Sequence, residues 1–221
     1  MKSSAANTDR IAVAGGRGFI GRAISRTLLA RRKQVLAFGR EGLSDPTIIT
    51  TLIWAAGGRE GGDIARLAES HVLAPLRVIA HAPNLRRLVY LSSGEVYGPG
   101  AVPFHEDSPR LGRSPYAQAK IRGEDELTAA CARAGIALII LRPGVVYGPG
   151  QAATMLIPAL LAALRAGQPF RTTAGEQTRD FLHIDDLVRL LVRCLDDDAP
   201  PGTYNAGTGV ETPVRAVIQT L

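Results

Sequence analysis

The run RIAVAGGRGFIGRAISRTLLARR at 10–32 constrains the fold most, because it joins a strand pattern to a helix pattern through glycines. Its first residues are continuously apolar, and its last part carries an apolar stripe of helical period. Gly15, Gly18 and Gly21 are spaced G-x-x-G-x-x-G between the two. This order favours a turn that binds a pyrophosphate at the helix N-terminus, as in dinucleotide-binding folds. The alternative is a tight turn that needs glycine only for its conformation.

Strand and helix patterns alternate along the rest of the chain. Further strands are predicted at 34–39, 51–57, 87–93 and 137–144, and helices over about 63–81 and 116–134, the second one stopped by Gly135. Strands this apolar are covered on both faces, and intervening helices join them in parallel. The sequence therefore predicts an α/β fold with a doubly wound parallel sheet of Rossmann type.

Composition narrows the class of protein further. The 221 residues are 46% hydrophobic and 21% charged, which suits one main globular domain with a small subdomain. No apolar run approaches the roughly 20 residues that span a bilayer, and the N-terminus is polar. Cys131 and Cys194 form neither a disulfide framework nor a metal cluster, so we expect a cytoplasmic protein without a metal site. The net charge of +6 comes with dispersed arginines and only 5% aromatics, which disfavours nucleic-acid binding.

The end of the second predicted strand bears on cofactor choice. An acidic residue there accepts hydrogen bonds from the adenosine ribose of NAD, but the sequence LAFGRE places Gly39 and Arg40 at this point. Arginine favours the 2′-phosphate of NADP, and Arg17 in the glycine turn offers a second cation. Both arginines are equally well explained as solvated loop charges. If the cofactor is NAD instead, Glu41, which follows that strand end, could accept the hydrogen bonds of the ribose.

The segment SPYAQAK at 114–120 contains one of only three lysines among 26 basic residues. Pro115 suits a helix start, which places Tyr116 and Lys120 four residues apart on one face. A phenol with an ordinary pKa of ~10 is a poor acid or base at neutral pH, and a nearby ammonium lowers that pKa. The pair is therefore a candidate for proton transfer. The alternative is a chance pairing on an ordinary surface helix.

Ser93 is a further candidate residue for the site of Tyr116 and Lys120. Ser93 ends a predicted parallel strand, where such sheets bind ligands, and its hydroxyl is suited to a substrate oxygen beside Tyr116. The alternative for Ser93 is a loop residue that hydrogen-bonds the local backbone.

Five stretches occur in an order typical of one superfamily: GGRGFIG, LVYLSSGEVYG, SPYAQAK, LRPGVVYGPG and RDFLHIDDL. With them, the chain resembles the extended short-chain dehydrogenases/reductases, specifically the NAD(P)-dependent epimerase/dehydratase group that acts on nucleotide sugars. The resemblance implies that Ser93, Tyr116 and Lys120 are catalytic. Tyr116 would exchange a proton with a sugar hydroxyl or carbonyl, Ser93 would orient that oxygen, and Lys120 would hold the nicotinamide ribose. The cofactor-binding set so implied is Gly15, Arg17, Gly18, Phe19, Ile20, Gly21, Arg40, Ala55, Tyr116, Lys120 and Pro143.

The resemblance also implies a substrate-binding set of Ser93, Glu95 and Arg179. Arg179 corresponds to an arginine that contacts the nucleotide diphosphate, the alternative being a salt bridge to Asp185 or Asp186. Dehydratases of the group carry an Asp-Glu pair where this chain has Gly94 and Glu95, so dehydration is disfavoured and epimerisation or 4-keto reduction remains. The alternative for Glu95 is a solvated loop carboxylate.

Several positions depart from the family pattern. Only residues 41–50 separate two strands that usually flank a further strand and helix, so we expect the sheet to lack one strand and to leave the adenine side open. His71 and Val145 stand where asparagines are common.

The expected organisation is a dinucleotide-binding domain at 1–148 and a partial substrate-binding region at 149–221 with segments that return to the core. The resemblance further implies a homodimer. These features predict an NADP-dependent oxidoreductase or epimerase, with NAD as the other cofactor considered. The alternative function is an NADP-binding regulatory or scaffold module without turnover.

Overall fold

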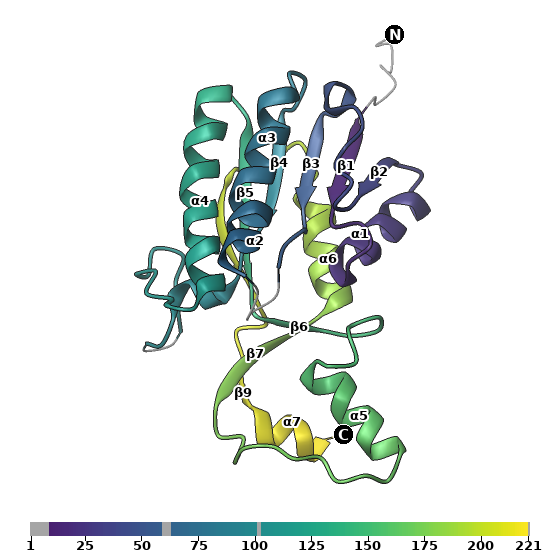
Figure 1. Ribbon diagram of the computed structural model, residues 1–221, viewed down its shortest axis with the longest axis vertical. Coiled ribbons are helices and arrows are strands. Elements are labelled where there is room, and N and C mark those ends of the chain that lie inside the picture. Colours follow the sequence, from purple (N-terminus) through teal and green to yellow (C-terminus); the bar gives the residue numbers. More distant parts are fainter. Residues whose placement is uncertain (1–8, 59–62, 101–102, 221) are drawn as a thin grey trace.

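The computed structural model describes residues 9–58, 63–100 and 103–220. A six-stranded sheet with helices on both faces forms the larger part, and a smaller lobe continues from one end of it (Figure 1). The strand order is β2-β1-β3-β4-β5-β8, and every neighbouring pair is parallel. The predicted doubly wound α/β fold is confirmed.

The predicted elements match the observed ones to within a few residues. The strands of the main sheet are β1 (Arg10–Ala14), β2 (Gln34–Phe38), β3 (Thr51–Trp54), β4 (Arg87–Leu91), β5 (Ala137–Pro143) and β8 (Gly202–Ala206). The helices around it are α1 (Phe19–Ala30), α2 (Ile64–Ala68), α3 (Ala74–His81), α4 (Pro115–Ala134) and α6 (Ile184–Arg193). A π-helical turn, Glu69–Leu73, joins α2 to α3.

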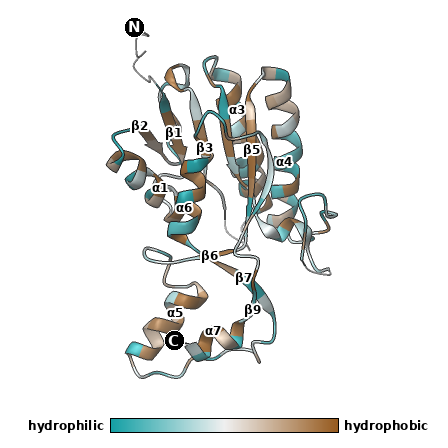
Figure 2. Cartoon of the chain, turned by 180° about the vertical axis from the view of Figure 1, so that it is seen from behind, coloured by the Kyte–Doolittle hydropathy of each residue, from teal (hydrophilic) through white to brown (hydrophobic). Residues whose placement is uncertain are grey.

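Alternate residues of the strands from β1 to β5 fill two separate cores, and β8 contributes to one of them. Ile11 and Val13 of β1 belong to the core shared with α1 and α6, whereas Ala12 and Ala14 belong to the core shared with α3 and α4. Most residues of β1, β3, β4 and β5 are apolar, and brown predominates in the central strands of Figure 2. Burial on both faces is the physical reason that these strands are recognisable in the sequence as continuous apolar runs.

The sheet ends at β2, as expected from the short interval that follows it. Between β2 and β3 the described chain forms only a 3₁₀ turn, Pro46–Ile48, whose start is capped by the Asp45 side chain. Within the described ranges, no further strand pairs with the outer side of β2. The carboxyl end of β2, where an adenosine would lie in a dinucleotide-binding fold, is therefore open on one side.

The smaller lobe consists of a three-stranded sheet and two helices. β6 (Val145–Tyr147) pairs in parallel with β7 (Thr178–His183), and β7 pairs in antiparallel with β9 (Glu211–Pro213). α5 (Leu156–Arg165) and α7 (Val214–Thr220) lie beyond this sheet (Figure 1). Between β7 and β9 the chain returns to the main sheet, where α6 packs against α1 and β8 pairs with β5.

None of the helices in the described ranges is long and apolar enough to cross a membrane. The polar N-terminal segment 1–8 lies outside those ranges.

Candidate active site

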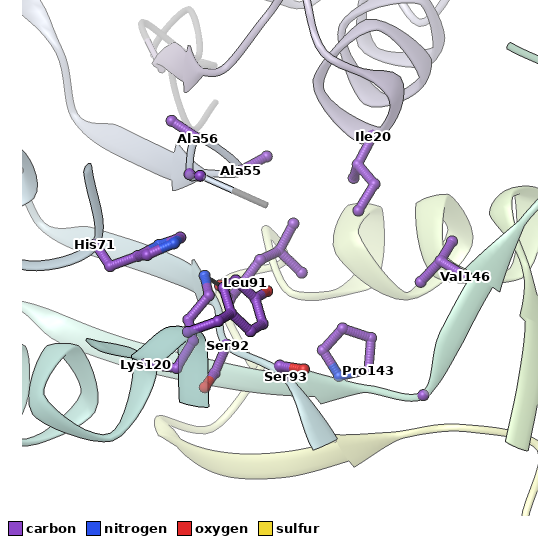
Figure 3. A pocket seen from close by; sticks show the side chains of 14 residues that line it. Ile20, Ala55, Ala56, His71, Leu91, Ser92, Ser93, Lys120, Pro143 and Val146 are labelled. Atoms are coloured by element: carbon purple, nitrogen blue, oxygen red, sulfur yellow. Dashed lines mark hydrogen bonds between the residues drawn. The ribbon is translucent and has the colours of Figure 1, made fainter. Parts of the chain in front are cut away.

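A pocket of about 190 Å³ opens at the carboxyl ends of the central strands. It lies beside the point where the strand order reverses between β1 and β3, which is where doubly wound sheets bind ligands. Its lining residues are Ile20, Ala55, Ala56, Gly57, Gly58, His71, Leu91, Ser92, Ser93, Tyr116, Lys120, Pro143, Gly144 and Val146 (Figure 3).

The glycine turn has the shape that a dinucleotide pyrophosphate requires. Gly15 has a φ of +77°, and a Cβ on Gly21 would lie 2.1 Å from the Gly15 carbonyl oxygen, so neither position tolerates a larger residue. Gly18 is the N-cap of α1, and no side chain caps the first turn of that helix. The amides at this helix start are thus available to an anion, and the residues present fit a dinucleotide.

Helix α4 presents Tyr116 and Lys120 to the pocket. Ser114 caps the helix by accepting a hydrogen bond from the Ala117 amide, and Pro115 occupies the first helical position. The Lys120 ammonium donates to the Leu91 carbonyl over 2.6 Å and lies 5.7 Å from the centroid of the Tyr116 ring. Lys120 is buried and Tyr116 is half-buried. The structure therefore brings the predicted tyrosine and lysine to one wall of one pocket.

Burial strongly affects the charge of Lys120. Desolvation lowers the pKa of its ammonium to about 7, and the nearby Glu124 carboxylate opposes that shift only in part. A lysine whose pKa lies near neutrality is able to gain or lose a proton at working pH, unlike an arginine. This property agrees with the choice of lysine in a chain that otherwise favours arginine.

The depressed lysine pKa predicts a pH-dependent stability difference from a Lys120→Met variant. At pH 7 and below, both the folded and the unfolded chain carry the proton, so wild type bears the full cost of a buried ammonium and the variant should be more stable. Between pH 7 and about 10, only the unfolded chain keeps the proton, so the free energy of unfolding of wild type should rise relative to the variant by a few kcal/mol. Urea unfolding of both proteins at pH 6, 8 and 9.5 measures this change, and a pH-independent difference would contradict it.

Ser93 also lines the pocket, and it makes the local bond considered as its alternative role. It is the N-cap of the 3₁₀ turn Gly94–Tyr97, where its Oγ accepts from the Glu95 amide at 3.2 Å. Because the Ser93 oxygen is the acceptor in that bond, its O–H group is still able to donate a hydrogen bond to a molecule in the pocket. Glu95 is exposed, accepts a hydrogen bond from Ser114 at 3.3 Å, and is outside the pocket lining.

The predicted cofactor-binding residues fall into two groups. Ile20, Ala55, Tyr116, Lys120 and Pro143 line the pocket, whereas Gly15, Arg17, Gly18, Phe19, Gly21 and Arg40 lie on the glycine turn or just after β2. Arg40 is exposed. Arg17 pairs with Glu41 at 3.2 Å, and the same carboxylate accepts from the Gly39 amide at 2.9 Å. Hydrogen bonds from its own backbone amide and then from the Gly39 amide, more than Arg17, hold the pKa of Glu41 below its usual value.

Arg179 lies apart from the pocket lining. It is an exposed residue of β7 in the small sheet, and its guanidinium donates to the Thr178 carbonyl. The aspartates considered as salt-bridge partners have other partners, since Asp186 pairs with Arg189 and Asp185 lies 3.5 Å from His183.

Sequence reasoning missed a buried ionic network beneath the pocket. Glu124 is 2% exposed and accepts hydrogen bonds from Nε and Nη2 of Arg142 at 3.0 and 2.7 Å. It also accepts from Ser92, the neighbour of Ser93, and from Arg110 at 3.2 Å. Two sequence signals were present: Glu124 follows Lys120 by one helical turn, and Arg142 interrupts an apolar strand.

Among the described residues, no three His, Cys, Asp or Glu side chains cluster as a metal site would require. The chemistry of the pocket is thus that of a phenol, an ammonium and a hydroxyl beside a dinucleotide-type turn.

A Rossmann sheet with this glycine turn and a Tyr–Lys pair on the helix after the fourth strand defines an NAD(P)-dependent enzyme of the extended short-chain dehydrogenase/reductase type. Comparison with known proteins agrees with that class. The model of the NAD dependent epimerase/dehydratase family matches residues 44–207, and the chain belongs to this family.

Individual relatives fall within the same group. The chain is 27% identical to a dTDP-6-deoxy-L-talose 4-dehydrogenase (NAD(P)(+)) of Kitasatospora kifunensis, over 96% of this chain and 78% of the relative. It is 36% identical to a UDP-glucose 4-epimerase of Mycolicibacterium smegmatis over 68% of this chain, but that alignment spans only 47% of the epimerase. Among solved structures, MoeE5 in complex with UDP-glucose and NAD is similar, with a TM-score of 0.85 and 29% identity over 95% of this chain and 80% of MoeE5.

Proposed function

We propose that this protein is an oxidoreductase or epimerase that acts on a nucleotide-linked sugar with a nicotinamide dinucleotide, by 4-keto reduction or by epimerisation. The observation that carries the proposal is the convergence of Ser93, Tyr116 and Lys120 on one pocket next to an open glycine turn. The relatives named above support the substrate class.

Each of the three side chains has a separate role in this proposal. Tyr116 exchanges a proton with the sugar oxygen, Ser93 holds that oxygen by a hydrogen bond, and Lys120 lowers the pKa of the phenol and binds the nicotinamide ribose. The bound nicotinamide supplies hydride transfer. The hydrogen bond to the Leu91 carbonyl holds the Lys120 ammonium near the Tyr116 ring, and its other N–H donors would be available to a ribose hydroxyl.

The substrate would extend from this pocket toward the smaller lobe. We assign dinucleotide binding mainly to residues 1–148 and substrate binding mainly to 149–221, with α6 and β8 as parts of the core. Arg179, on the exposed side of β7, is then the cation for the nucleotide diphosphate, and Glu95 lies near the sugar.

An absorbance assay tests the function. Purified protein is incubated with NADPH or NADH and 4-keto nucleotide sugars, and with UDP- and dTDP-hexoses for epimerisation, while nicotinamide absorbance and sugar products are followed. Turnover on any of these supports the proposal. Tight dinucleotide binding with no turnover across the panel would favour the regulatory or scaffold module instead.

We propose NADP as the preferred cofactor, on the strength of Arg17 and Arg40 at the open end of β2. Glu41 opposes this preference, because its carboxylate would repel a 2′-phosphate while it stays on the Gly39 amide. Because Arg40→Ala removes a cation that would contact the 2′-phosphate, it should weaken NADPH binding by about tenfold and NADH binding by less than twofold. Fluorescence titration of both dinucleotides measures this, with the exposed Arg26→Ala on α1 as the control of equal charge. Equal affinity for both dinucleotides, unchanged in Arg40→Ala, would refute the preference.

We further propose a cytoplasmic homodimer that pairs through α4 and its neighbour α3, as the resemblance implies. Both cysteines are unpaired and buried, which supports a reducing compartment. Light scattering at micromolar concentration tests the dimer.

A further inference from the structure

His71 is a buried histidine that the roles assigned above do not use. It lies in the π-helical turn Glu69–Leu73 and is 1% exposed. Its backbone carbonyl accepts from the Tyr90 hydroxyl at 3.2 Å, which fixes the turn to the sheet. π-Helical turns inside helices occur frequently at functional sites.

Neither ring nitrogen of His71 meets the geometry of a hydrogen bond to the described residues, and the Gly58 backbone is near enough only for a weak polar contact with the ring. Yet the side chain belongs to the pocket lining, and Figure 3 shows it on the side of the pocket shared by Lys120 and Ala56. An unpaired buried polar group in a native protein is costly and needs an explanation. Here the open space beside the ring is the pocket itself, so a bound molecule can supply the missing partner.

The ring also shapes the pocket wall. Its plane meets the Tyr116 ring edge-on, with centroids 5.4 Å apart and an interplanar angle of 80°. A Cβ on Gly57 would lie 1.9 Å from the His71 Cε1 atom. The His71 ring therefore occupies space that is free only because residue 57 is a glycine. Packed in this way, the ring restrains Tyr116 from the side of β3.

The ring is neutral at working pH. Burial and then the Lys120 ammonium lower the pKa of His71 to about 3, against a smaller opposite effect of the Gly58 backbone. A neutral imidazole offers one N–H donor and one acceptor nitrogen. The hydroxyls of a nicotinamide ribose and the carboxamide of the nicotinamide each offer the complementary groups.

We propose that His71 is both a ligand-binding and a positioning residue. One ring nitrogen hydrogen-bonds the nicotinamide-ribose end of the bound dinucleotide, directly or through one water, while the ring edge holds Tyr116 in place. This inference rests on the proposed function, since it requires a dinucleotide in the pocket.

Two variants separate the two roles. His71→Phe keeps the ring and its packing but removes both nitrogens, so NADPH and NADH affinity should fall about five- to tenfold, the cost of one lost hydrogen bond. Its thermal midpoint without ligand should equal or exceed that of wild type, because an unpaired polar group has gone. A residue with a merely structural role would not weaken binding in a protein of undiminished stability.

His71→Asn keeps a polar group but removes the ring that restrains Tyr116, so kcat should fall more than KM rises. It also vacates the space beside Gly57. Gly57→Ala alone should therefore destabilise the protein, whereas the double variant His71→Asn/Gly57→Ala should recover most of that loss in thermal midpoint.

The outcomes distinguish this inference from the proposed function. Wild type that binds neither dinucleotide in fluorescence titration would overturn both. Wild type that binds, with His71→Phe equal to it in affinity and kcat, would overturn the inference alone. If His71→Phe fails to fold, the test is the thermal midpoint of the double variant His71→Asn/Gly57→Ala. A midpoint as low as that of Gly57→Ala would overturn the packing of His71 against Gly57, and a midpoint that recovers would support it.

Discussion

Tyr116→Phe is expected to lower kcat by a factor of about 10² to 10⁴ while it changes dinucleotide affinity by less than about twofold. The substitution removes one hydroxyl from a half-buried ring on the pocket wall and keeps the edge-on contact with His71. In the proposed mechanism the sugar oxygen then keeps only the Ser93 hydroxyl, which orients it, and loses its proton-transfer group, because the Lys120 ammonium is held on the Leu91 carbonyl. Loss of kcat with intact binding is the result expected when a group acts on the reacting atoms.

Tyr204→Phe is the matched control, since its hydroxyl donates to the Pro200 carbonyl at an exposed position outside the pocket. It should match wild type in kcat and KM. The absorbance assay gives the kinetic constants and fluorescence titration gives the affinities. A Tyr116→Phe protein with at least half of the wild-type kcat would remove Tyr116 from the chemistry.

Five of the six strands of the main sheet were predictable because they are largely apolar and covered by helices, whereas β8, with the sequence GTYNA and mostly half-buried residues, was not predicted. Runs such as RIAVA and RLVYL carry no polar interruption, and each is followed by a helix of clear period, so local pattern and tertiary environment agree. The strands of the smaller lobe were not predicted. β6 and β9 have three residues each and β7 is mostly half-buried, so they show neither a continuous apolar run nor a clean alternation.

Some residues of the candidate site were also predictable from the sequence, and others were not. Tyr116, Lys120 and Ser93 were found because the position of each is fixed by local structure, namely a capped helix start and the end of a strand. His71 lines the pocket because a π turn rotates the helix there, and helical periodicity does not reveal such a turn. The Glu124–Arg142 pair joins α4 to β5, a contact between residues 18 positions apart that no local pattern specifies.

The largest stability effect is expected at that pair. Arg142→Met should lower the free energy of unfolding by about 3–5 kcal/mol, because it leaves the Glu124 carboxylate buried without its bidentate partner. The same substitution removes the hydrogen bonds from Arg142 to the Tyr97 hydroxyl and to the Glu106 carbonyl. Glu124→Gln should cost less, since an amide still accepts from Arg142 but carries no charge.

The double variant Glu124→Met/Arg142→Met tests the cause. If the cost of Arg142→Met comes from an uncompensated charge, then removal of both charges should recover more than half of it. Urea unfolding of wild type, Glu124→Met, Arg142→Met and the double variant gives the coupling energy. Recovery of stability should not restore activity, because Glu124 also accepts from Ser92 and thereby positions the strand end that carries Ser93. A double variant as unstable as Arg142→Met would contradict the charge argument and would place the cost in lost packing and in the Tyr97 and Glu106 bonds instead.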